Sequence, residues 1–240
     1  MQDKVYSKAQ THIVDFAFTD EVAAVFPDMI RRSVPGYETV IPMTGLIAAR
    51  HLGATGKALD LGCSLGATTK AILSQTDAAD VSVIGVDNSP AMIERARQIN
   101  TDPRAEFIEA DIQSQAAIAH FHHAKVILLN FVLQFIEPAS RLSTLKQLHR
   151  CLPADGLLIV SEKIQSSDPA THALFDETHL AWKRANGYSD LEVSQKRSAI
   201  ENVMVVDPVE THVERFQTAG FSHVTQWYQC MNWASFLVQP

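Results

Sequence analysis

The sequence of 240 residues predicts a doubly wound α/β fold, with a mostly parallel seven-stranded sheet that one antiparallel strand closes. Short apolar runs alternate with segments of helical periodicity, which is the pattern of βαβ units in a parallel sheet. A glycine-containing turn at 62–66 follows the first apolar run, and acidic or amide side chains follow the next three. Ligands of open α/β sheets bind beyond the carboxyl ends of the strands, so these residues are expected to share one site.

The composition is that of a globular protein with a sizeable core, because 46% of the residues are hydrophobic. The formal net charge of −7 supplies no Lys/Arg surplus for a phosphate backbone, so a small substrate or a protein partner is expected instead of nucleic acid. Cys63, Cys151 and Cys230 are widely spaced, which indicates free thiols in a reducing compartment. The polar start and the absence of a long apolar run predict a cytoplasmic protein without a membrane span.

The first 52 residues are expected to form an arm and two helices that cover the ligand site. Residues 1–17 are a polar arm, and Asp20 is predicted to cap a helix that reaches Phe26, where Pro27 interrupts it. A turn at residues 35–37 precedes a second helix at 38–52.

Residues 53–240 are expected to form the ligand-binding part of a single structural domain. Ser89 and Pro90 are well suited to open a helix after the second strand, and a further helix covers 138–152. A charged segment at about 163–206 is predicted to be a helical insertion, and another helix covers 207–220. The predicted strands are 57–61, 81–86, 105–109, 125–129, 157–161, 224–228 and 234–238.

The turn at 62–66 also matches G-x-S-x-G, the turn that presents the nucleophilic serine of α/β-hydrolases. Such an enzyme needs an upstream oxyanion loop and a downstream acid and histidine. The sequence has no H-G-G-G-like stretch, and Asp207 and His212 lie too close together on one predicted helix for a triad. The context therefore favours a ligand-binding turn over a nucleophilic Ser64.

Polar residues at the next three strand ends support the ligand-binding interpretation. Asp87 and Asn88 end the second predicted strand, where a carboxylate can accept both hydroxyls of a ribose. Asp111 follows the third strand and Asn130 the fourth. Ser64 occupies a position where dinucleotide-binding turns usually have glycine, which favours a ligand without pyrophosphate. The series resembles class I S-adenosylmethionine-dependent enzymes and the Rossmann-like methyltransferase fold.

Four longer segments narrow the resemblance. Residues 26–37, 60–67, 87–95 and 183–198 are similar to the carboxy-S-adenosyl-L-methionine synthase family, and the similarity extends from about residue 18 to residue 237. The resemblance implies a transferase that moves the carboxyl group of prephenate to the sulfonium methyl of S-adenosylmethionine and releases phenylpyruvate and water. It also implies a homodimer without a metal. A partner enzyme would use the product, carboxy-S-adenosylmethionine, to carboxymethylate a wobble uridine of tRNA.

The resemblance also implies the residues of the site. Arg197 would hold the added carboxylate, because a guanidinium forms a planar, permanently charged fork. No protein base is expected, since the hydroxide that leaves prephenate can take the methyl proton. The residues expected to bind S-adenosylmethionine are Tyr37, Gly62, Cys63, Ser64, Asp87, Asn88, Asp111, Ile112, Asn130 and Arg197.

Two other functions stay open at this stage. One is an ordinary S-adenosylmethionine-dependent methyltransferase, and the other is a non-catalytic S-adenosylmethionine-binding partner of a tRNA-modifying enzyme. The cluster His120, His122 and His123 is not expected to bind a metal, because no acid or cysteine is nearby. The tryptophans, among them Trp233, are expected to serve packing or an interface.

Overall fold

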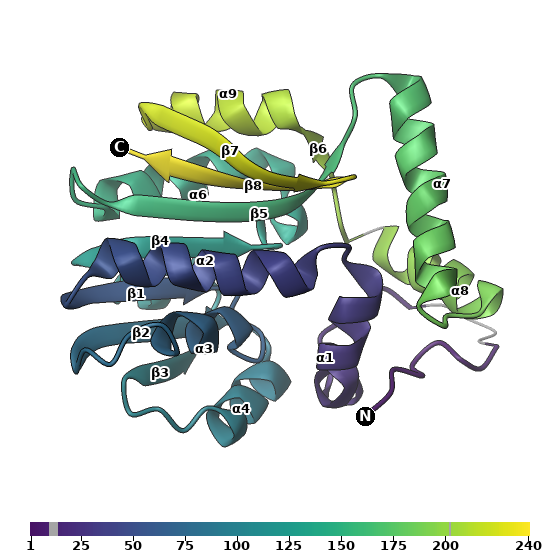
Figure 1. Cartoon of the computed structure of the whole chain (residues 1–240), viewed down its shortest axis with the longest axis horizontal. Coiled ribbons are helices and arrows are strands. Elements are labelled where there is room, and N and C mark those ends of the chain that lie inside the picture. The colour runs from purple at the N-terminus through teal and green to yellow at the C-terminus, as the bar shows by residue number, and fades with distance from the viewer. Residues whose placement is uncertain (10–13, 202) are drawn as a thin grey trace.

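The computed structural model describes residues 1–9, 14–201 and 203–240, which form one mixed sheet of eight strands between two layers of helices (Figure 1). Seven strands follow the order β3-β2-β1-β4-β5-β8-β7, and β8 is antiparallel to both of its neighbours. This arrangement confirms the predicted fold class. The strands are β1 (Thr55–Leu61), β2 (Asp80–Asp87), β3 (Ala105–Glu109), β4 (Ala124–Asn130), β5 (Leu157–Gln165), β6 (Asp207–Pro208), β7 (His223–Cys230) and β8 (Trp233–Gln239).

The helices lie on both faces of the sheet and beyond one of its ends. Within the described residues, no helix combines the length and apolar character needed to cross a membrane. The helices are α1 (Asp20–Ser33), α2 (Tyr37–Leu52), α3 (Ala67–Leu73), α4 (Pro90–Ile99), α5 (Gln115–Ile118), the 3-10 turn η1 (Leu133–Phe135), α6 (Pro138–Cys151), α7 (Pro169–Ala185), α8 (Asp190–Glu201) and α9 (Val209–Ala219).

Successive residues of the central strands point to opposite faces of the sheet, and each face carries its own core. In β1, Ala58 packs in the core under α2 and α3, whereas Leu59 packs in the core under α6 and α9. In β4, Leu128 and Leu129 divide between the two cores in the same way. Both faces are therefore dry, and polar side chains are displaced to the strand ends.

The first helix differs from the prediction in two respects. Thr19, and not Asp20, is the N-cap, since its hydroxyl accepts the Val22 N–H at 3.4 Å. Pro27 lies inside α1 and does not end it. Proline removes one helical hydrogen bond, but burial of the apolar face, which includes Val22 and Met29, continues through it and offsets that loss.

The segment predicted as a helical insertion begins with the end of a strand. β5 continues four residues past the predicted end, to Gln165, and is followed by α7 and α8. Figure 1 shows α1, α7 and α8 beyond the carboxyl ends of the parallel strands, on the side where the N-terminal arm also lies. Asp3 of the arm is buried and accepts the Tyr188 hydroxyl, which attaches the arm to the insertion. Residues 10–13 of the predicted arm lie outside the described residues.

Candidate active site

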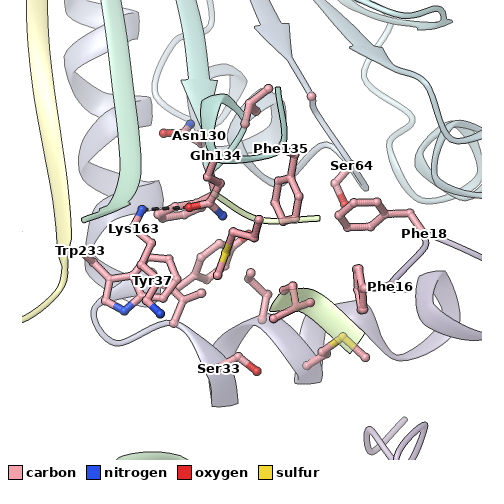
Figure 2. A pocket seen from close by; sticks show the side chains of 18 of the residues that line it. Phe16, Phe18, Ser33, Tyr37, Ser64, Asn130, Gln134, Phe135, Lys163 and Trp233 are labelled. Atoms are coloured by element: carbon pink, nitrogen blue, oxygen red, sulfur yellow. Dashed lines mark hydrogen bonds between the residues drawn. The ribbon is translucent and has the colours of Figure 1, made fainter. Parts of the chain in front are cut away.

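A cavity of about 960 Å³ lies at the carboxyl ends of the strands, between the sheet and the helices α1, α7 and α8. Figure 2 shows part of its lining, with Ser64 and Phe18 toward one side of the view and Lys163 and Trp233 toward the other. All the predicted site residues contribute to the wall, namely Tyr37, Gly62, Cys63, Ser64, Asp87, Asn88, Asp111, Ile112, Asn130 and Arg197.

The glycine turn is fixed to β2 through its backbone. The N–H groups of Gly62 and Cys63 both donate to the Val86 carbonyl, at 2.7 and 3.0 Å. Gly62 has φ +71°, and a Cβ there would lie 2.5 Å from a methyl of Val132. Only glycine satisfies both constraints without strain, so the turn passes directly under the chain that follows β4. Burial raises the pKa of the Cys63 thiol, so this side chain is not a ready nucleophile.

Backbone N–H groups hold both carboxylate oxygens of Asp87. One carboxylate oxygen accepts the Ser64 N–H at 2.8 Å and the other accepts the Ser89 N–H at 2.9 Å. Ser89, not Asp87, caps α4, since its hydroxyl accepts the Met92 N–H. Burial raises the pKa of Asp87, whereas the two N–H groups lower it. Asp111 is exposed, and its carboxylate accepts the Gln113 N–H at 2.8 Å.

The structure does not assemble the hydrolase triad. The Ser64 hydroxyl contacts the Met92 sulfur at 3.4 Å and, within the described part of the chain, no histidine. Asp207 forms ion pairs with Arg141 and Arg215. His212 is buried against Phe216 and Phe236, away from the cavity wall. The G-x-S-x-G match is therefore a backbone turn and not a nucleophile elbow.

The end of β4 provides one polar and one aromatic group. The Asn130 amide donates to the Thr68 hydroxyl at 3.0 Å, and its buried carbonyl oxygen has no partner among the described residues. Phe131 has φ +63° and donates its N–H to the Ser161 carbonyl at 2.6 Å. Its ring contacts Tyr37 and Trp233, with centroid distances of 6.2 and 5.5 Å. The end of β4 therefore combines an acceptor without a partner among the described residues and an aromatic ring packed against two others.

Glu162 supports this end of the sheet, although sequence reasoning did not single it out. Its carboxylate accepts the N–H groups of Val132, Leu133 and Gln134 at 3.0, 2.8 and 3.1 Å. Burial raises the pKa of Glu162 to about 8, and these N–H groups act against that rise. The side chain of Gln134 in turn accepts the Lys163 N–H at 3.0 Å (Figure 2). A buried acid thus fixes η1 on the cavity floor.

Four cationic side chains line the cavity beside β5, α7 and α8: Lys163, Lys183, Lys196 and Arg197. Lys196 donates to the Ser33 hydroxyl at 2.8 Å and lies 3.7 Å from the Asp3 carboxylate. Burial, and then repulsion by the three other cations, lower the pKa of Lys183 to about 7. Within the described residues, Lys163, Lys183 and Arg197 have no carboxylate within ion-pair distance.

Of these cations, only Arg197 was predicted from the sequence. It lines the cavity from α8 and is itself exposed. Lys163, Lys183 and Trp233 were missed. For Lys163 a usable signal existed, because a charged pair, Glu162-Lys163, directly follows the fifth apolar run, at the edge where ligands bind. Nothing local marks Lys183 or Trp233, which come to the cavity through folding.

Comparison with known proteins identifies the family of this chain. A family model described as a methyltransferase domain matches residues 58–156. A carboxy-S-adenosyl-L-methionine synthase of Trichlorobacter lovleyi is 48% identical over 98% of this chain and 97% of its own length. The synthase of Pseudomonas paraeruginosa is 44% identical over 99% of this chain and 96% of its own length. The chain belongs to the carboxy-S-adenosyl-L-methionine synthase family. Family membership identifies it as a transferase.

Solved structures of low identity share the fold of this family member. An O-methyltransferase family protein from Burkholderia thailandensis has a TM-score of 0.67 at 16% identity, covering 91% of this chain and 59% of its own. Human N-acetylserotonin methyltransferase in complex with SAM has a TM-score of 0.63 at 15% identity, covering 92% of this chain and 55% of its own. These similarities confirm the Rossmann-like methyltransferase fold.

Proposed function

We propose that this chain converts S-adenosylmethionine and prephenate to carboxy-S-adenosylmethionine, phenylpyruvate and water. In this reaction the ring of prephenate loses its carboxyl group as carbon dioxide and its hydroxyl as hydroxide, and becomes aromatic. The hydroxide takes a proton from the sulfonium methyl to give water. The methyl carbon forms its new bond to the carbon dioxide, so that all atoms and charges balance. The names of the relatives at 44–48% identity support this assignment.

The cofactor end of the cavity suits S-adenosylmethionine. Asp87 and Asn88, at the end of β2, are the groups proposed to bind the ribose hydroxyls, and Asp111 and Ile112 to flank the adenine. The unpartnered carbonyl oxygen of Asn130 is a free acceptor for the ammonium group of the amino acid moiety. The backbone of the glycine turn, with Cys63 and Ser64, lies where bare peptide can contact the ligand.

Arg197 is proposed to hold the carboxylate that is added to the methyl carbon. Among the described residues its guanidinium has no ion-pair partner, so its charge is available to a ligand. A charge-assisted contact of this kind contributes about 1.5–3 kcal/mol, which favours carboxylated over plain cofactor by roughly one to two decades. This free cation in one cavity with the glycine turn is the observation that carries the proposal.

The protein is proposed to contribute proximity and exclusion of water, without a base of its own. Two ionisable groups that line the cavity, Asp60 and His179, already have hydrogen-bond partners. Asp60 accepts the N–H and the hydroxyl of Thr69 at 3.0 and 2.8 Å. The His179 ring nitrogen is 2.8 Å from the Ser33 carbonyl, and burial lowers the pKa of this histidine to about 3. The departing hydroxide is therefore the expected proton acceptor.

Mass spectrometry of the cofactor after incubation with S-adenosylmethionine and prephenate tests the proposal. We expect a product heavier than S-adenosylmethionine by one carboxyl group in place of one hydrogen, with one phenylpyruvate formed for each product molecule. Formation of S-adenosylhomocysteine instead would identify an ordinary methyltransferase. Binding of both compounds without turnover would identify a non-catalytic subunit.

Three further assignments accompany this function. The chain is proposed to be one structural domain in the cytoplasm, in which residues 1–52 cover the cofactor site. It is proposed to form a homodimer through the insertion, where Leu174 and Leu191 are 59% and 41% exposed. The product is proposed to pass to a tRNA carboxymethyltransferase, and the net charge of −7 agrees with a chain that does not hold tRNA itself. Light scattering of the purified protein checks the dimer.

A further inference from the structure

The end of the cavity opposite the glycine turn has more positive charge than the proposed cofactor can balance. Lys163 and Lys183 interact there with each other, with Arg197 and with one carboxylate, that of Asp176. Lys196 has Asp3 as its own partner at 3.7 Å. Glu201, one turn after Arg197 on α8, also lines the cavity. Three cations thus stand against two carboxylates, a surplus of one positive charge.

Packing brings Lys163, Lys183 and Trp233 together. Lys163 of β5 and Trp233 of β8 are directly paired across the antiparallel register. The His179 ring lies 5.9 Å from the Trp233 ring, and Lys183 follows His179 by one turn of α7. Figure 2 shows Lys163 and Trp233 on the same side of the cavity. The three groups therefore form one cluster from a strand pair and a helix.

Trp233 adds a hydrogen-bond donor to this cluster. Its side chain is 6% exposed and lines the cavity, and its indole N–H has no acceptor among the described residues. A buried donor without a partner costs free energy unless a ligand satisfies it. An indole N–H in one cavity wall with two lysine side chains fits a carboxylate, which accepts several hydrogen bonds and is otherwise costly to bury.

S-adenosylmethionine does not meet this demand, because its sulfonium and ammonium groups outweigh its single carboxylate. A substrate that brings a further carboxylate to this end of the cavity would balance the remaining positive charge. We propose that Lys163, Lys183 and the Trp233 indole N–H bind the pyruvyl carboxylate of prephenate, the one that is not transferred. This inference rests on the proposed function and assigns the second substrate's binding site within it.

The division of labour follows from the chemistry. The pyruvyl carboxylate keeps its charge from prephenate to phenylpyruvate, so a fixed cation pair can hold it throughout the reaction. The ring carboxylate loses its charge as carbon dioxide and regains it on the methyl carbon, where Arg197 is placed to bind it. The lysine pair would hold prephenate in place throughout, and Arg197 would bind the carboxyl group that is transferred. Together these contacts would orient the substrate for transfer.

Phenylpyruvate is the probe that separates the two anchors, because it has the retained carboxylate and lacks the transferred one. Its inhibition constant and the Michaelis constant for prephenate are measured for Lys183→Met, which keeps the stem and removes the charge. We expect both constants to rise about 10- to 100-fold. Arg197→Ala should leave phenylpyruvate inhibition unchanged. Unchanged phenylpyruvate inhibition in Lys183→Met would overturn the assignment.

Further variants exclude a loss of folding as the cause. Lys183→Met should melt at a higher temperature than the wild type, because it removes a desolvated cation from beside three others. Lys183→Arg should restore most of the affinity for phenylpyruvate, and Trp233→Phe should weaken it several-fold. Lys70→Met, an exposed lysine of α3, is the matched control and should change nothing. If the wild type forms no carboxylated product, the proposed function is wrong. If the wild type forms the product but phenylpyruvate inhibits the variants as strongly as the wild type, only this inference is wrong.

Discussion

The two ends of the cavity are built in opposite ways. At the glycine turn, Asp87 is held by two backbone N–H groups at 2.8 and 2.9 Å, so the geometry is complete without a ligand. At the cationic end, no carboxylate among the described residues lies within ion-pair distance of Lys183 or Arg197, and the Trp233 N–H has no acceptor there. The first end is organised in advance by the backbone, whereas the second has charges that only a ligand balances. This contrast indicates that binding energy for the anion is stored as unpaired charge, at a cost to stability.

Glu162 connects the two ends, and its replacement should have the largest effect. Glu162→Gln places an amide donor against one of three backbone N–H groups and leaves that buried donor without an acceptor. We expect the free energy of unfolding to fall by about 3 kcal/mol, as for a buried hydrogen-bond network that is broken. Urea unfolding measures this change.

The control for this variant is Glu106→Gln, on the exposed surface of β3, which should change stability by less than about 0.5 kcal/mol. Equal stability of the two variants would show that η1 does not depend on the buried carboxylate. Glu162 would then not be the residue that connects the two ends of the cavity.

Asp87→Ala tests the preorganised end. The variant removes the acceptor for the Ser64 and Ser89 N–H groups and the proposed ribose contact. We expect the affinity for S-adenosylmethionine to fall about 100-fold, measured by calorimetry. The matched variant Asp111→Ala removes an exposed carboxylate and should cost about tenfold at most. A larger loss for Asp111→Ala would contradict the ranking of the two acids.

Most of the fold could be predicted because its pattern is local. The apolar runs predicted β1 to β5 with small errors at their ends, since β1, β2, β4 and β5 are buried on both faces and the edge strand β3 buries Phe107. The errors have physical causes. The predicted fifth strand stops before Glu162 and Lys163, because charged residues are unusual in a buried strand. In the structure β5 includes both residues, which lie at the edge of the site. Pro27 was read as a helix end, although packing of α1 overrides it.

The candidate site was predictable where one short segment supplies several groups. The glycine turn and the residues after β2, β3 and β4 follow the rule that ligands bind at strand ends. The cationic end has no such rule, because Lys183 and Trp233 come from α7 and β8 and meet only through the packing of His179 and Phe131. Arg197 was found through family resemblance, because a run of polar and charged residues such as 195–197 is by itself typical of a solvated helix face.

Arg197→Ala tests the proposed discrimination at the cationic end. The variant should lower the affinity for carboxy-S-adenosylmethionine by about one to two decades and leave the affinity for S-adenosylmethionine nearly unchanged. Only the former compound has the added carboxylate. Competitive binding of the two compounds measures this difference. Equal losses for both would remove Arg197 from the proposed role.

The smallest expected effect is a pH dependence confined to the cationic end. Burial and then repulsion lower the pKa of Lys183 to about 7, so this side chain loses its charge as the pH rises through that value. A bound carboxylate favours the charged form, so anion affinity should be highest below the pKa and fall above it. The groups that face Lys183 are Lys163, Lys196, Arg197, Asp176 and His179.

One titrating group predicts that the inhibition constant of phenylpyruvate rises by up to about tenfold per pH unit above about 7. Lys183→Arg should flatten this profile, because a guanidinium keeps its charge over the whole range. The affinity for S-adenosylmethionine serves as the internal control and should stay level between pH 7 and pH 9. A pH dependence of phenylpyruvate inhibition that persists in Lys183→Arg would assign the titration to another group.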